Sequence, residues 1–122
     1  MALTRRAASA LLLVALLVVG RDLAAAHSLL IESTPAANTN LTTPPRELVL
    51  RFNNRIEKKL SKVRLVGGNG ERLEVPVAVT GRADTLTGPL PALAPGPWRL
   101  EWQVLSTDGH VVSGAFSFRL GP

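Results

Sequence analysis

The sequence predicts an all-β fold, a sandwich of about seven short strands with an immunoglobulin-like or Greek-key arrangement. After residue 26 the chain shows no long helical period, and its apolar residues alternate in short runs such as Trp98–Val104. Pro, Gly and Asn separate these runs at the spacing that is typical of sandwich turns. Alternation with a period of two is expected of strands that bury one face, which is why these observations favour a β-sandwich.

Three strands are expected ahead of the strongest turn signal. Ser28–Glu32 is the first, and Thr34-Pro35 stops it. Glu47–Phe52 is the second; it follows two prolines, alternates strictly and ends at Asn53-Asn54. Ser61–Val66 is the third. The side chains expected to face the core from the second and third strands are Leu48, Leu50, Phe52, Val63 and Leu65.

The second half of the domain starts with a predicted hairpin at Gly67–Gly70, whose sequence is Gly-Gly-Asn-Gly. Arg72–Val79 follows, and the proline at position 76 indicates an edge strand or a bulge. Thr85–Thr87 is a short strand, after which several prolines keep the chain extended. Trp98–Val104 and Ala115–Leu120 then complete the sandwich.

The N-terminal residues have the composition of a removable signal peptide. Two arginines near the start precede an apolar run, Leu11–Val19, which is short for a bilayer span, and Ala24–Ala26 resembles a cleavage site. We therefore expect residues 1–26 to be removed on export and residues 27–122 to form one domain without a stable membrane anchor. An uncleaved N-terminal anchor is the alternative, and the arginine pair leaves the export route open.

Composition restricts the function classes. Removing residues 1–26 lowers Lys+Arg from 14 to 11 and Asp+Glu from 9 to 8, so the net charge falls from +5 to +3. Scattered bases on an exported chain argue against nucleic acid as a partner. The chain has no Cys, and its only Met is Met1, so a metal site in the exported domain must use nitrogen and oxygen ligands.

His27, Asp108 and His110 are the candidate metal ligands. Asp108 and His110 are two residues apart, so in extended backbone their side chains would leave the same face. His27 would begin the exported chain and offer both its α-amine and its imidazole, which can lose their protons to a metal near neutral pH. Three nitrogens and one oxygen form the tetragonal set that Cu(II) prefers.

Each of these residues also has a simpler interpretation. His27 could stand at the cleavage point by accident, and Asp108-Gly109-His110 could be an ordinary turn in which the carboxylate caps backbone amides. Ser113 would complete a Ser-His-Asp set on paper. Parallel side chains two apart on a strand are, however, a poor arrangement for a carboxylate that must orient the imidazole from behind.

Several segments resemble the CopC family of periplasmic copper-resistance proteins, and together they cover nearly all of residues 27–122. The C-terminal block, of the form WxVxSxDGHxxSGxFxF, is the most specific of them. The matching segments are His27–Leu29, Ser33–Ala36, Leu48–Asn53, Gly96–Trp102, Val104–His110 and Val112–Phe118.

The resemblance implies a cupredoxin-like or immunoglobulin-like sandwich in the bacterial periplasm that binds one Cu(II) through His27, Asp108 and His110. Many members of the family place a Glu near the copper where this chain has Asn54, which adds no charge. Some members also carry a Met-rich segment for Cu(I), which this chain lacks, so it resembles the Cu(II)-only type. The implied partner is an inner-membrane copper transporter of the CopD type.

The leading interpretation is therefore a non-enzymatic Cu(II) carrier or buffer that acts in copper homeostasis and resistance. One alternative is a copper mono-oxygenase with a histidine brace, since that site also uses an N-terminal His and a second His. The other is an accessory β-sandwich module without a metal.

Overall fold

The computed structural model describes residues 28–122, so the expected signal peptide and His27 lie outside the described residues. The described chain contains eight strands and one 3₁₀ turn. In chain order the elements are β1 (Leu30–Thr34), β2 (Asn40–Leu41), β3 (Glu47–Phe52), η1 (Lys58–Leu60), β4 (Lys62–Gly67), β5 (Arg72–Val75), β6 (Thr85–Pro89), β7 (Gly96–Leu105) and β8 (Val111–Leu120).

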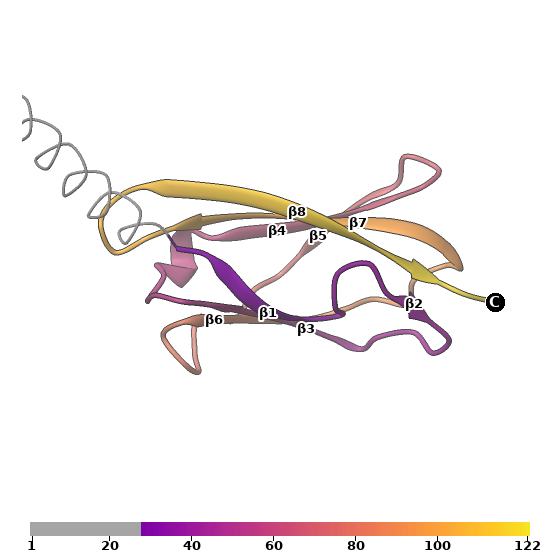
Figure 1. Ribbon diagram of the computed structural model, residues 1–122, viewed down its shortest axis with the longest axis horizontal. Helices are drawn as coiled ribbons and strands as arrows, with labels where there is room; N and C mark the ends of the chain where they lie inside the picture. Colours follow the sequence, from indigo (N-terminus) through magenta and orange to yellow (C-terminus); the bar gives the residue numbers. More distant parts are fainter. Residues whose placement is uncertain (1–27) are drawn as a thin grey trace, which may run out of the picture.

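The strands form two sheets that face each other, as Figure 1 shows. One sheet has three strands in the order β1-β3-β6, and the other has five in the order β2-β8-β7-β4-β5. The strand pairs are antiparallel except for the short parallel contact of β2 with β8. The all-β sandwich predicted from the alternation is confirmed.

The core fills the space between the two sheets. β3 and, from the opposite sheet, β4 bury every second side chain. β7 follows the same alternation with Trp98, Leu100 and Val104 buried and Trp102 half-buried, so the apolar side chains of the two sheets meet in the middle. Burial of this alternating set is the main source of stability for a domain without disulfides. Leu48, Leu50, Phe52, Val63 and Leu65 are each at most 1% exposed, as the sequence predicts.

The structure corrects the expected limits of several strands. β1 begins at Leu30 rather than at Ser28, because the N–H groups of Ser28 and Leu29 donate to side chains instead of to a neighbouring strand. β5 ends at Val75, since Pro76 has no N–H to continue the ladder. β8 begins at Val111, four residues earlier than expected, because it pairs with β7 along its whole length. The sequence did not predict β2 or η1.

The topology brings the start of the described chain and the β7–β8 loop to the same end of the sandwich (Figure 1, left). β1 belongs to the three-stranded sheet and the loop to the five-stranded sheet, so a site at this end joins the two sheets. Within residues 28–122 no helix is long and apolar enough to cross a membrane.

Candidate metal centre

A tight turn between β7 and β8 carries the Asp-Gly-His sequence. The backbone N–H of Ser106 donates to the carbonyl of His110 at 2.9 Å, and the N–H of Gly109 donates back to the carbonyl of Ser106 at 3.0 Å. Gly109 has φ +87, a left-handed conformation that favours glycine. The turn therefore fixes the backbone on both sides of Gly109, and with it the two side chains that could bind a metal.

Asp108 and His110 are in direct contact. One carboxylate oxygen, Oδ1, accepts the backbone N–H of His110 at 3.0 Å, and the other, Oδ2, lies 2.9 Å from the imidazole Nδ1. The structure thus brings the predicted pair together, but through a turn rather than through extended backbone. The capping role that the simpler interpretation gives to Asp108 is also present, because the same carboxylate holds an amide of its own turn.

The spacing of these two atoms suits a shared metal ion. Imidazole nitrogens and carboxylate oxygens lie about 2 Å from a small divalent metal ion. Two such ligand atoms that form a right angle at the ion are therefore about 2.8 Å apart. The 2.9 Å between Nδ1 and Oδ2 matches that separation. Both atoms could therefore bind one ion, while the other carboxylate oxygen keeps its contact with the backbone N–H of His110.

The first described residue is anchored against this turn. The backbone N–H of Ser28 donates to Ser106 Oγ at 3.1 Å, and the hydroxyl of Ser106 donates to Ser28 Oγ at 2.6 Å. Both residues are fully buried, at 1% and 2% exposed. Ser28, the first described residue, is therefore fixed beside the turn.

Asn53 holds the next residue of the same segment. Its side-chain Oδ1 accepts the N–H of Leu29 at 2.7 Å, and its own N–H donates to the carbonyl of Leu29 at 2.9 Å. Asn54 follows directly and is half-buried. The chain then returns to the turn, where Ile56 forms a bridge with Ser106. Asn54 therefore belongs to the segment that links Leu29 to the Asp108–His110 turn.

Sequence reasoning missed the anchoring residues. Ser106 and Asn53 are neither metal ligands nor acids, and the sequence alone assigns them no role beyond their place in segments that resemble the CopC family and, for Asn53, at the end of a strand. One signal in the sequence could have found Ser106. It comes two residues after the inward-facing Val104, so strand alternation predicts that its hydroxyl is also buried. A buried hydroxyl needs a partner, and here that partner is Ser28.

The structure changes the argument against a hydrolytic triad. Asp108 does contact the imidazole Nδ1, so the expectation that the two side chains are poorly placed for such a contact was wrong. Ser113, however, lies on β8 opposite Gln103, and no hydrogen bond joins it to His110. A triad therefore lacks its nucleophile contact.

No group of three His, Cys, Asp or Glu side chains gathers within residues 28–122. Among the described residues, Asp108 and His110 are therefore a pair of such side chains and not part of a larger group.

A family model described as the CopC domain matches residues 30–121. Among curated relatives, the chain is 32% identical over 96 residues to Protein YobA of Escherichia coli K12, covering 76% of this chain and 77% of that protein. It is 29% identical over 106 residues to Copper resistance protein C of Pseudomonas syringae pv. tomato, covering 80% and 83% of the two chains. It also matches 18% of the length of Copper transport protein CutJ of Bacillus subtilis, at 28% identity over 99 residues, or 79% of this chain.

Solved structures of the same kind have a similar fold. CopC from Methylosinus trichosporium OB3b matches with a TM-score of 0.74 and 30% identity, covering 79% of this chain and 95% of that one. PcoC of Escherichia coli, described as a methionine-rich copper resistance protein, matches with a TM-score of 0.66 and 25% identity, covering 78% and 99%. Met1 is the only methionine of the present chain, so it lacks the feature that this description names.

Proposed function

Since the chain belongs to the CopC family, we propose that it is an exported, periplasmic Cu(II)-binding protein that carries or buffers one copper ion. Copper resistance and transport are named in several of its relatives, which supports a copper-related role for this chain. The observation that carries the proposal is the meeting of the anchored Ser28 with the turn that holds Asp108 and His110.

The proposed ligands are the α-amine and imidazole of His27, the carboxylate of Asp108 and the imidazole of His110. His27 is bonded to Ser28, and Ser28 is fixed to Ser106 only two residues from Asp108. A removed signal peptide would turn the His27 nitrogen from an amide, whose lone pair is delocalised, into a free amine. Export would thereby complete the site.

The donor set determines the oxidation state. Three nitrogens and one carboxylate oxygen suit Cu(II), whereas Cu(I) prefers soft thiolate and thioether ligands. Residues 27–122 contain neither Cys nor Met. We therefore propose a Cu(II) site whose affinity falls when copper is reduced.

The proposed role is binding and transfer without turnover. A carboxylate at Asp108 would occupy an equatorial position that oxygen chemistry needs open, so the ligand set favours a carrier over a mono-oxygenase. Delivery to, or receipt from, a CopD-type inner-membrane transporter is the proposed physiological step. Such a transporter would need a site that can exchange Cu(II) with the nitrogen and oxygen ligands of this chain.

The test compares three purified proteins in Cu(II) titrations against one chelator: the chain starting at His27, the same chain with one extra Ala in front, and His27→Ala. The first should bind one equivalent far more tightly than the other two, because each of those loses one nitrogen of the N-terminal chelate. Equal affinity of the extended and unextended chains would show that the amine is not a ligand.

A matched control separates this from a general loss of structure. Arg72 is the first residue of β5, at the end of the sandwich remote from the β7–β8 turn. The Arg72→Gln variant should therefore bind copper like the unmodified protein. Mass spectrometry of exported protein that begins at any residue other than His27 would contradict the proposed ligand set directly.

A further inference from the structure

The five-stranded sheet has one edge that is only partly used. β8 pairs with β7 from Val111 to Leu120, but on its other side β2 contacts only the last two residues. The segment just before β2 adds one more bond, from the N–H of Asn38 to the carbonyl of Ser117 at 2.8 Å. Along the first half of β8 no described residue pairs with this outer side.

The direction of the free backbone groups follows from the bonds that do form. The N–H of Arg119 donates to the carbonyl of Thr39, and the carbonyl of Ser117 accepts from the N–H of Asn38. The backbone N–H and C=O groups of odd-numbered residues in β8 therefore point away from β7. Backbone groups in a strand alternate between its two sides. Val111, Ser113 and Ala115 therefore direct their N–H and C=O groups outward from the sheet.

The other edge strands carry protective features that this half of β8 lacks. β1 contains a register shift between Leu30 and Glu32, and β5 carries charged residues and ends at Val75, just before Pro76. The outer edge of β6 is covered by the segment after β5. In this segment the N–H of Ala78 donates to the carbonyl of Thr87 at 2.8 Å. Charges, prolines, bulges and covering segments are the usual means of blocking an edge.

β8 from Val111 to Phe118 has no charge, no proline and no bulge. Val111 at its start is 59% exposed, so an apolar side chain also stands open there. The unblocked half of β8 is thus shaped to accept another extended strand. It also begins at the residue after His110.

The outer face beside this edge is positively charged. Along the five-stranded sheet it carries five cations and two acids, at positions that alternate with buried core residues. Both acids are close to Arg64 in the strand register. The charged residues are Lys62, Arg64, Arg72, Arg99 and Arg119 with Glu74 and Glu101.

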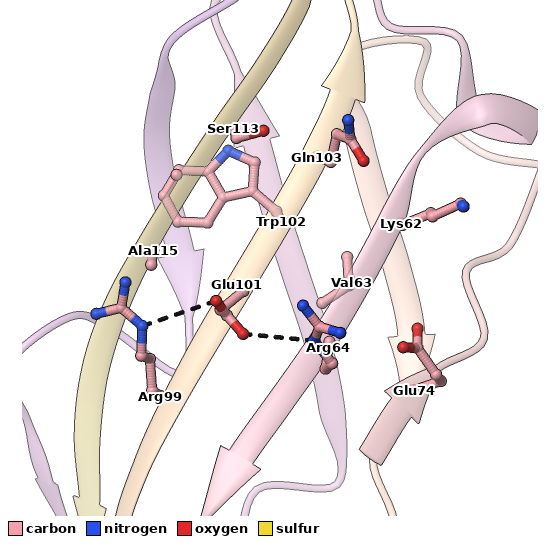
Figure 2. A pocket seen from close by; sticks show the side chains of 11 residues that line it. Lys62, Val63, Arg64, Glu74, Arg99, Glu101, Trp102, Gln103, Ser113 and Ala115 are labelled. Carbon is pink, nitrogen blue, oxygen red and sulfur yellow. Dashed lines mark ion pairs between the residues drawn. The ribbon is translucent and has the colours of Figure 1, made fainter. Parts of the chain in front are cut away.

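Arg99 is the cation that an added strand would meet. Figure 2 shows its side chain leaning over β8 beside Ala115, where the small side chains of β8 leave it uncovered. Its ion pair with Glu101 is long, at 3.9 Å, and Glu101 is also 3.4 Å from Arg64. One carboxylate thus serves two guanidinium groups, and Arg99 keeps 58% of its side chain exposed.

We propose that the edge of β8 from Val111 to Ala115 docks an extended, acidic segment of a protein partner, which adds to the sheet as a further strand. Main-chain hydrogen bonds to Val111, Ser113 and Ala115 hold the segment, and its acidic side chains on the outer face approach Arg99. Strand addition of this kind draws its affinity from the backbone and its specificity from alternate side chains. The interaction goes beyond copper binding and does not require the metal.

The first experiment uses an eight-residue peptide of alternating Val and Glu as the probe. Titration into the purified protein, followed by amide exchange, should protect the N–H groups of Ser113 and Ala115, to which no described residue is hydrogen-bonded. Gly114 should change little, because its N–H already faces β7. A peptide that is N-methylated at every residue should not bind, since it has no backbone N–H to donate to β8.

Ser113→Pro is the decisive variant. It removes an N–H that faces the open edge and leaves the bonds to β7 in place, and edge strands tolerate proline. Binding of the peptide should weaken about tenfold, the loss expected for one or two backbone hydrogen bonds. Ser113→Thr is the matched control; it keeps the N–H and should bind as the unmodified protein does. Retained amide protection of β7 would show that both variants are folded.

The charge requirement has its own pair of variants. Arg99→Gln should weaken binding several-fold, and Arg72→Gln, which lies on the same face two strands from β7, should not. A Val and Lys version of the peptide should bind more weakly than the Val and Glu version.

Three results would overturn the proposal. One is equal binding to Ser113→Pro and Ser113→Thr. Another is protection confined to residues on the outer face, with no change at Ser113 and Ala115. The third is protection of Ser113 that rises with protein concentration in the absence of peptide, together with a dimer in sedimentation, because a second copy would then be the occupant.

Discussion

At the scale of single residues, the candidate metal centre depends on side chains that are not themselves ligands. Ser106 and Asn53 hold the backbone N–H groups of Ser28 and Leu29. Asp108 holds the imidazole of His110 and its backbone amide with the same carboxylate. If Asp108 and His110 bind the metal as proposed, hydrogen bonds from residues that are not ligands would support the site, a common arrangement around metal ions.

Ser106→Ala tests that outer layer. The substitution leaves the N–H and hydroxyl of Ser28 buried without their partner, which should lower the free energy of unfolding by about 1–3 kcal/mol. Cu(II) affinity should fall as well, although no proposed ligand is removed. Urea unfolding and a chelator competition measure the two effects. Ser113→Ala is the control, and it should change neither quantity appreciably; an unchanged affinity in Ser106→Ala would show that the anchor does not position the site.

Asn54→Glu should tighten Cu(II) binding. The residue lies in the segment between Asn53 and the Ile56–Ser106 bridge, and the added negative charge would attract a divalent ion nearby. Competition titration at low and at physiological salt checks this, and the gain should shrink as salt rises. An unchanged affinity at low salt would place the side chain too far from the ion to act on it.

At the scale of the strands, the β7–β8 hairpin is held by close packing at one glycine. A Cβ added at Gly114 would overlap Cζ2 of Trp102, the residue paired with it across the hairpin. Trp102 in turn packs its ring against Phe116 and Phe52, with centroids 6.0 Å and 6.5 Å away. The indole therefore lies in the space that the missing side chain leaves.

Gly114→Ala should consequently destabilise the protein by about 1–3 kcal/mol, the usual cost of forcing extra volume into packed contacts. The Trp fluorescence of the folded state should shift at the same time, because Trp102 must move. Chemical unfolding followed by fluorescence measures both. If Gly114→Ala were as stable as the unmodified protein, the hairpin would be able to accommodate the added methyl group without a loss in the free energy of unfolding.

The loop ahead of β6 contributes a charge pair that makes stability depend on pH. The Arg82 guanidinium, the Thr85 hydroxyl and their hydrogen bonds hold the pKa of Asp84 well below its ordinary value. A lowered pKa in the folded state stabilises the protein above the unfolded pKa, which is about 3.9 for Asp. That contribution is lost as the pH falls below this value.

Asp84→Asn should therefore be less stable than the unmodified protein at neutral pH, and the difference should shrink as the pH is lowered through about 4 toward 2. Thermal unfolding across this range measures it. Glu71→Gln, in the β4–β5 turn, is the control, because the side chain of Glu71 makes no described ion pair. A difference that is independent of pH would rule out the charge pair as its cause.

At the scale of the whole molecule, the proposed metal connects the two sheets. His27 precedes the strand that enters the three-stranded sheet, whereas Asp108 and His110 belong to the loop of the five-stranded sheet. An ion that binds only the folded state stabilises it by mass action, by about 2.7 kcal/mol at 100 times the dissociation constant. Cu(II) should raise the unfolding temperature of the purified protein.

Reduction should reverse that increase. Ascorbate with a Cu(I) chelator should return the unfolding temperature to the metal-free value, because the ligand set lacks sulfur. Calorimetry with and without the two reagents checks it. Retention of the increase under these conditions would reveal ligands for Cu(I) that the proposed site does not contain.

The parts of the fold that the sequence predicts are those set by local pattern. Glu47–Phe52 alternates strictly and forms β3 with the predicted limits, since each inward position is apolar. β2 could not be predicted, because its two residues form a strand only through contact with β8, far along the chain. The Asp108–His110 contact forms through the turn at Gly109 and not through the extended backbone that the spacing predicted, and the Ser28–Ser106 contact depends on the meeting of two sheets.

The bond between Ser28 and Ser106 spans 78 positions of sequence, and it joins one of the first residues of the domain to one of its last loops. A growing or truncated chain that ends after β6 can already pair β1 with β3, but it has nothing to hold Ser28. The proposed copper site therefore exists only in a complete and folded molecule. Metal loading would then act as a test of integrity, in which unfinished or clipped chains cannot hold an ion and release it to those that can.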